Sequence, residues 1–179
     1  MAEAFINQVN RAVGIVTSSS NASIGVGLTW MSGISTAHVA INDLVDNSNF
    51  IAGTKVTLVG VSSVQLDRAS TNTVAATASN VSFLGPTTSY TSASATKSIL
   101  IGGTFANNTA NSVNLTVTVY DNSATTESQL AAKIPVPTGS SFVISDAGKT
   151  VLEGDDEVRV YCDVENAIDV NLSILKGGS

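Results

Sequence analysis

The clearest pattern in the chain is a strict alternation of apolar and polar residues in its C-terminal half. Over 113–119 the odd-numbered positions are Val, Leu, Val and Val, and the positions between them are polar. The same alternation recurs over 158–164 and 168–174. A period of two is typical of half-buried antiparallel strands, so we expect Thr116 and Thr118 to face outward, opposite the apolar face.

Two shorter strands are predicted nearby, over 133–137 and 141–145. Pro135 and Pro137 confine the first of them to a sheet edge or a strand end. With turn residues recurring about every 8 to 12 positions, the pattern is that of a β-sandwich. We therefore predict an all-β protein in which residues 97–179 form an antiparallel β-sandwich, jelly-roll or Ig-like. Its core is expected to include Val117, Val160 and Leu172.

Residues 37–96 are predicted to form a small β-hairpin unit followed by a linker. Apolar and polar residues alternate over 56–59 and 64–67, on either side of a loop that contains Gly60. A loop of this length with a glycine suits a hairpin. Val81 and Phe83 indicate one more short strand before the Gly85-Pro86 break, and the Ser/Thr-rich segment 86–98 is interpreted as a linker.

Residues 1–36 differ from the rest and are expected to form an N-terminal arm, partly extended or helical. Phe5, Ile6, Val9 and Val13 fall at helical spacing within 1–16, although a short isolated helix is marginal. The alternative for this stretch is a terminus that becomes ordered only when packed. Residues 17–35 are rich in Ser and Gly, which favours irregular structure.

We predict that the arm docks on a partner through Phe5, Ile6, Val9, Trp30 and Met31. Trp and Met are favoured at protein interfaces, and these two stand in an otherwise polar segment. Two alternatives stay open. Trp30 and Met31 could cap the core of the hairpin that follows, and the whole arm could fold back onto its own sandwich.

Composition and charge narrow the classes of function. The 179 residues are 43% apolar and 12% charged, with a net charge of −6. The 8 Lys and Arg residues are scattered, so no basic cluster exists to bind nucleic acid. No apolar run is long enough to span a bilayer, and the N-terminus lacks the pattern of a signal peptide. Synthesis in a cytoplasm without membrane attachment is therefore expected, and a single cysteine excludes an intramolecular disulfide.

Candidate chemistry is sparse. His38 and Cys162 are the one histidine and the one cysteine; Cys162 is expected to be a buried apolar residue and His38 to pack or cap a turn. The acidic run Glu153–Glu157 is interpreted as a polar turn, with general acid–base work or a Ca²⁺ site as alternatives. We expect a protein that is not an enzyme and that has no cofactor and no metal.

Two stretches resemble structural proteins of tailed phages. In 43–73, Ile51-Ala52-Gly53-Thr54, an alternating strand and Val64-Gln65-Leu66 resemble a hairpin unit common in those proteins, although that unit often has Pro where this chain has Ile51. The segments SILIGGTFANNT, VNLTVTVYD, KIPVPTGSSFVIS and GKTVLEGDDEVRVYCDVENAIDVNLSIL are similar to virion proteins of marine T4-like cyanophages. Together these stretches cover most of residues 40–176.

The resemblance implies a virion component, made in the host cytoplasm, that assembles with other virion proteins such as major capsid, neck or tail subunits. We expect a non-enzymatic structural protein that decorates the capsid exterior or belongs to the neck, forms a homo-oligomer and attaches through its N-terminal arm. The alternative is a tail-fibre or host-attachment module that binds glycans on exposed aromatic residues. A tailspike hydrolase would need two carboxylates poised in a groove.

Overall fold

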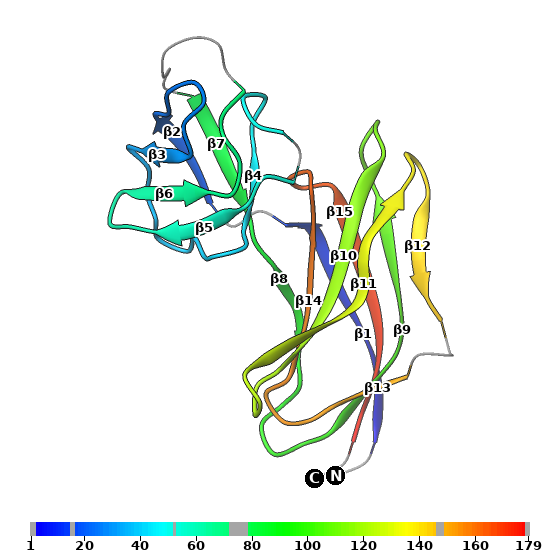
Figure 1. Cartoon of the computed structure of the whole chain (residues 1–179). Coiled ribbons are helices and arrows are strands. Elements are labelled where there is room, and N and C mark those ends of the chain that lie inside the picture. Colours follow the sequence, from blue (N-terminus) through cyan, green and yellow to red (C-terminus); the bar gives the residue numbers. More distant parts are fainter. Residues whose placement is uncertain (1–2, 15–16, 52, 72–78, 146–148, 178–179) are drawn as a thin grey trace. The chain divides into compact units, whose positions relative to one another are not determined.

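The computed structural model describes residues 3–14, 17–51, 53–71, 79–145 and 149–177, and these form strands, turns and loops with no helix (Figure 1). The strands, in chain order, are β1 (Ala4–Val13), β2 (Thr17–Ala22), β3 (Trp30–Ser32), β4 (Leu44–Asp46), β5 (Val56–Val59), β6 (Ser63–Leu66), β7 (Ser79–Leu84), β8 (Thr87–Thr91), β9 (Ser98–Asn107), β10 (Val113–Asp121), β11 (Thr126–Val136), β12 (Ser141–Ile144), β13 (Thr150–Leu152), β14 (Glu157–Cys162) and β15 (Ile168–Lys176).

The chain divides into two compact units. The first, here called the sandwich unit, contains residues 1–13, 87–162 and 166–179. The second, the small β unit, contains residues 14–86 and 163–165. The chain thus leaves the sandwich unit after residue 13 to build the small β unit, returns at residue 87, and contributes residues 163–165 to the small β unit before it ends in the sandwich unit.

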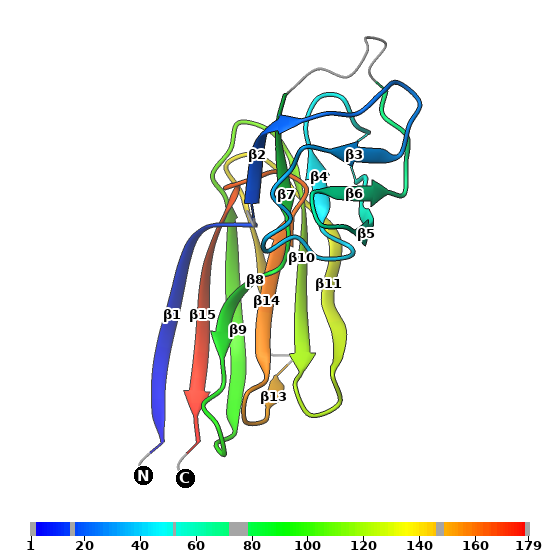
Figure 2. The same cartoon turned by 90° about the vertical axis from the view of Figure 1, so that its left-hand side faces the viewer.

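The sandwich unit consists of two antiparallel sheets (Figure 2). One has the strand order β1-β15-β9-β12, with β13 also paired to β9; the other has the order β11-β10-β14-β8. The predicted core residues Val117 and Val160 lie opposite each other on β10 and β14, and both are fully buried, as is Leu172 on β15. The antiparallel sandwich predicted from the alternation is therefore confirmed.

Thr116 and Thr118 lie on the outer face of β10, as expected, beside Tyr161 and Arg159 of β14, but both are buried there. The hydroxyl of Thr118 donates to Oε1 of Glu127 at 2.6 Å, and Oγ1 of Thr116 accepts from the backbone N–H of Lys133 at 3.2 Å. Strand β10 lies between β11 and β14, so neighbouring side chains cover its outer face as well.

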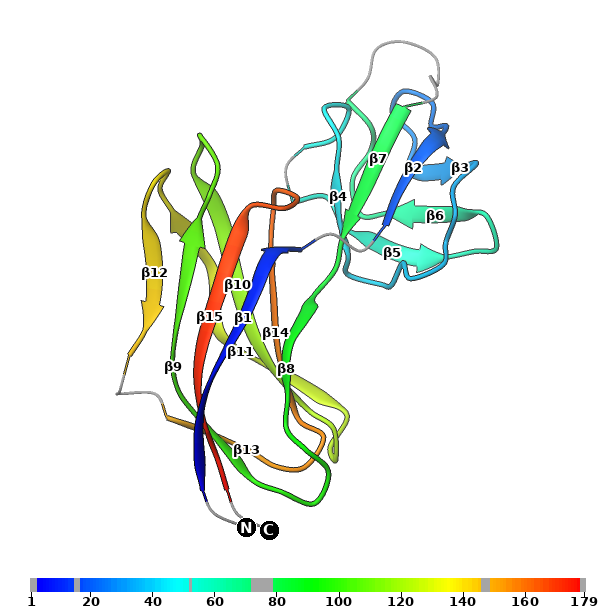
Figure 3. The same cartoon turned by 180° about the vertical axis from the view of Figure 1, so that it is seen from behind.

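The first part of the predicted N-terminal arm is a strand, and the helical expectation for it is wrong. Strand β1 pairs antiparallel with β15, from Ala4 opposite Lys176 to Asn10 opposite Val170 (Figure 3). A helix of this length would be marginal in isolation, whereas β15 offers a row of backbone partners and an apolar face. For residues 4–13, the fold-back alternative describes what the structure contains.

The small β unit holds two three-stranded sheets, ordered β2-β7-β4 and β3-β6-β5. The predicted hairpin is present as β5 and β6, and the predicted strand around Val81 and Phe83 is β7. Strand β3 comes from the segment expected to be irregular; it pairs with β6 and places Met31 opposite Val64 in the core. The expectation of irregular structure over 17–35 is therefore wrong for β2 and β3. Their Ser-rich sequence does not alternate clearly, and they are strands because β7 and β6 pair with them.

The boundary after the hairpin unit lies earlier than expected. Pro86 is the last residue of the small β unit before the chain re-enters the sandwich, where the predicted boundary was after residue 96. The segment 86–98, expected to be a linker, contains β8, which pairs with β14. Polar side chains of this segment can be buried because they form hydrogen bonds with one another. For example, the buried hydroxyls of Tyr90 and Ser98 are 2.9 Å apart.

Candidate functional site

Two of the five predicted docking residues lie exposed on the first strand of the sandwich unit. Phe5 is 78% exposed and Val9 is 62% exposed, both on the outward face of β1. Ile6, on the opposite face of the strand, is partly buried. Large apolar side chains this accessible on an edge strand are candidates for a protein interface.

The other two predicted docking residues belong to the small β unit. Trp30 on β3 is 49% exposed, and the next residue, Met31, is fully buried in the core of that unit. Adjacent residues of a strand point to opposite faces, so only Trp30 is accessible to a partner. The five residues therefore do not share one arm, and Met31 serves the core, which was the alternative interpretation.

The structure brings Phe5 together with residues that the sequence patterns did not single out. Phe5 lies opposite Leu175 on β15, Leu175 lies opposite Ile99 on β9, and Ile99 lies opposite Val151 on β13. Directly opposed residues share one face of a sheet, so these four form a continuous row across four strands. We call it the outer apolar row.

The outer apolar row is accessible. Val151 at one end is 57% exposed, Phe5 at the other end is more exposed still, and Leu175 and Ile99 between them are partly buried. Ile99, Val151 and Leu175 each have a core neighbour: Leu100, Leu152 and Ile174 point to the opposite face and are fully buried. In the sequence, each of these residues could be recognised as an apolar residue at an outward position of an alternating strand. Only the pairing of the strands shows that the four lie side by side.

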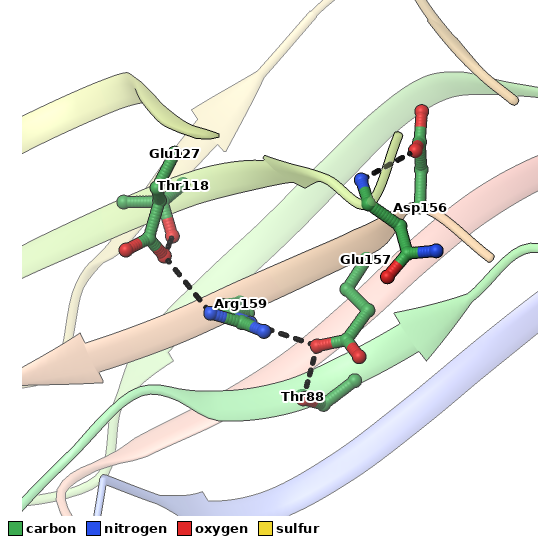
Figure 4. Close-up of polar contacts among 7 residues, drawn as sticks. Thr88, Thr118, Glu127, Asp156, Glu157 and Arg159 are labelled. Atoms are coloured by element: carbon green, nitrogen blue, oxygen red, sulfur yellow. Dashed lines mark hydrogen bonds and ion pairs between the residues drawn. The ribbon is translucent and has the colours of Figure 1, made fainter. Parts of the chain in front are cut away.

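The outer face of the other sheet carries a polar network centred on Arg159 of β14 (Figure 4). Its Nε donates to Oε2 of Glu157 at 2.7 Å, and its terminal nitrogen lies 3.8 Å from Oε1 of Glu127. The guanidinium carbon stands 3.9 Å from the centre of the Tyr120 ring, within the range of a cation–π contact.

Hydroxyl groups extend this network across the sheet. Thr88 on β8 donates to Oε2 of Glu157 at 2.8 Å, and Thr118 on β10 donates to Glu127 on β11 (Figure 4). All four strands of the sheet are therefore connected by side chains. Because Arg159 and both glutamates already have partners within the sheet, the network acts as a clamp between strands and not as an open anion site.

Residues 153–156 of the acidic run form the turn between β13 and β14, as predicted, and Glu157 begins β14. Asp156 is buried and accepts from the backbone N–H of Asn122 at 3.0 Å and of Glu153 at 2.8 Å. The carboxylate of Glu153 pairs with Lys97 Nζ at 2.8 Å, and Glu157 belongs to the Arg159 network. Of the four acids in the run, Glu153, Asp156 and Glu157 thus have different partners.

Cys162 takes the buried position expected of it, and His38 lies in a turn. Cys162 is fully buried on the inward face of β14. His38 is exposed in a turn with a left-handed backbone, φ 68°. Over the described ranges no three His, Cys, Asp or Glu side chains gather as metal ligands, and no helix could cross a membrane.

Comparisons of this chain with protein-family models, with curated proteins and with solved structures find no match.

Proposed function

We propose that the protein is a non-enzymatic structural component of a tailed-phage virion, decorating the capsid exterior or forming part of the neck. It attaches to a neighbouring virion protein through a surface that includes Phe5 of the N-terminal strand. The observation that carries the proposal is the outer apolar row, from Phe5 through Leu175 and Ile99 to Val151.

An apolar row on a sheet face suits a protein partner better than a small substrate. It runs straight across four strands, and its ends are its most exposed residues. Contiguous exposed apolar surface of this kind marks interaction sites, because covering it removes apolar area from water. The virion setting is supported by the resemblance of 43–73 and of the C-terminal half to tailed-phage structural proteins.

The non-enzymatic part of the proposal is supported by how the charged groups are used. Asp156 holds a turn, and Glu157 and Glu127 hold Arg159 between strands. Groups that serve as fixed structural partners are poorly suited to accept and release protons in a reaction.

The proposal is tested by measuring how much of the protein purified particles carry when the chain is supplied as the Val151→Ser variant. Truncating an apolar anchor at an interface costs more than about 1 kcal/mol, so at limiting supply the occupancy should fall several-fold. Val61→Ser is the matched control, because Val61 is 97% exposed in the small β unit and lies outside the row. Full occupancy by Val151→Ser would contradict attachment through the row, and absence of the protein from particles would contradict the virion role.

A second candidate function is host attachment through glycan binding, favoured by the exposure of Trp30. An indole half open to solvent on β3 can stack against a sugar ring. In that case Trp30→Ala should abolish binding to host surface glycans in a glycan-array measurement while Val151→Ser leaves it unchanged. Equal glycan signals from Trp30→Ala and the parent protein would exclude this function for Trp30.

A further inference from the structure

Strand β1 lies at one end of its sheet. It pairs with β15 over Ala4–Asn10, and among the residues that the structure describes no other strand pairs with it. An edge strand presents alternate N–H and C=O groups that can pair with another strand. Proteins often block such edges with Pro, Lys or a central bulge, but AFINQVNRAV contains neither Pro nor Lys, and its register shift comes only after Asn10.

The outward side chains along this edge form a self-complementary series. Reading along the chain, every second residue is exposed: Glu3, Phe5, Asn7, Val9 and Arg11; Ala4, on the opposite face, is exposed as well. Asn7 is the midpoint, with one large apolar residue on either side of it and one charge of opposite sign beyond each. A series of this kind matches its own reverse.

We propose that β1 pairs antiparallel with β1 of a second copy of this chain, about a two-fold axis at Asn7. In this register Phe5 lies opposite Val9 of the second copy, and Glu3 lies opposite Arg11 of the second copy. Two-fold symmetry makes each of these contacts twice. The two β1-containing sheets become one continuous sheet, and the free backbone groups of both edges are paired.

Neighbouring registers lose this complementarity. Centring the pair on Gln8 places Phe5 opposite Arg11, and centring it on Ile6 places Val9 opposite Glu3. Opposed apolar pairs and opposed opposite charges stabilise antiparallel strands, and like charges directly opposite destabilise them. The charges therefore select the register at Asn7, and they also select a second copy of this chain as the occupant of the edge.

This inference is independent of the virion role, because it concerns the isolated protein. Sedimentation analysis of the full chain should show a monomer–dimer equilibrium. Arg11→Glu should raise the dimer Kd roughly tenfold or more, since it replaces two attractive contacts with two repulsive ones. The double variant Glu3→Arg/Arg11→Glu should return the Kd close to that of the parent protein. A chain that stays monomeric at about 100 μM, or a double variant that does not recover, would overturn the proposal.

A crosslink tests the register directly. Opposed residues of an antiparallel pair have Cα atoms about 4.5–5.5 Å apart, within the range that a disulfide spans. Asn7→Cys should therefore form a covalent dimer under mild oxidation. Thr104→Cys is the matched control, because Thr104 is exposed on the same sheet face but on β9, away from the edge. Equal crosslinking of the two variants would overturn the pairing at Asn7.

Discussion

At the scale of single residues, two partly buried carboxylates, Asp43 and Asp46, lower the stability of the small β unit when they are ionised. Burial raises the pKa of Asp43, although its Oδ2 accepts from the backbone N–H of Ala40 at 2.8 Å. Burial also raises the pKa of Asp46, and the negative charges of Glu165 and Asp163 raise it further. Each group is harder to ionise in the folded protein than in the unfolded chain.

These shifts predict the sign of a pH dependence. An acid whose folded pKa is raised costs stability above that pKa, and the cost disappears as pH falls through it toward the ordinary value of 3.8. Asp46→Asn should therefore increase the free energy of unfolding of the small β unit at neutral pH. It should also reduce the gain in stability that the parent protein shows on mild acidification. Thermal melts between neutral pH and pH 4 measure both effects.

Asp121→Asn in the sandwich unit is the matched control. The backbone N–H of Ala124 and the hydroxyl of Ser123 hold the pKa of Asp121 below its usual value. This carboxylate contributes stability above 3.8 that is lost as pH falls through its lowered folded pKa. Its replacement should destabilise at neutral pH. An Asp46→Asn variant that also melts earlier than the parent would contradict the assignment of cost to Asp46.

At the scale of elements, the strands with the most accessible apolar residues are those at sheet edges. Strand β1 ends one sheet and β12 ends the same sheet on the other side. Val143 on β12 is exposed, while Phe142 beside it points inward, 6.2 Å from the ring of Phe105. Strand β11, which carries Pro135, ends the second sheet, as the proline predicted. Of these edges, only β1 combines length, lack of proline and complementary charges.

At the scale of the whole molecule, each of the two units has its own core. Met31, Val64 and Phe83 are among the buried residues that pack together in the small β unit, and Leu172 is fully buried in the sandwich unit. A domain with its own apolar core can unfold as its own cooperative unit.

We therefore expect two separable unfolding transitions in calorimetry. Leu172→Ala should destabilise the transition of the sandwich unit, and Met31→Ala that of the small β unit, each by about 2–5 kcal/mol. Each variant serves as the control for the other. If Leu172→Ala left both transitions in place, the register that buries Leu172 would be wrong. If each variant lowered both transitions equally, the units would not unfold independently.

The sequence by itself determined the strands whose two faces differ. In β14 and β15 alternate residues are buried, so the period of two in the sequence was enough to predict these strands. Cys162 was predicted to be buried for the same reason. The hairpin β5–β6 was predicted from two alternating segments joined by a glycine-containing loop. The turn at 153–156 followed from its glycine and acids.

Only the tertiary structure decided the parts that depend on partners distant along the chain. Strand β1 is extended because it pairs with β15, although the local spacing of its apolar residues favoured a helix. Strand β8 is a strand because it pairs with β14, although its Ser/Thr-rich sequence favoured a linker. The outer apolar row joins residues 5, 99, 151 and 175 through register alone. The physical reason is that backbone pairing between strands is non-local: alternation tells which face of a strand is apolar, but only the neighbouring strand determines what lies beside it.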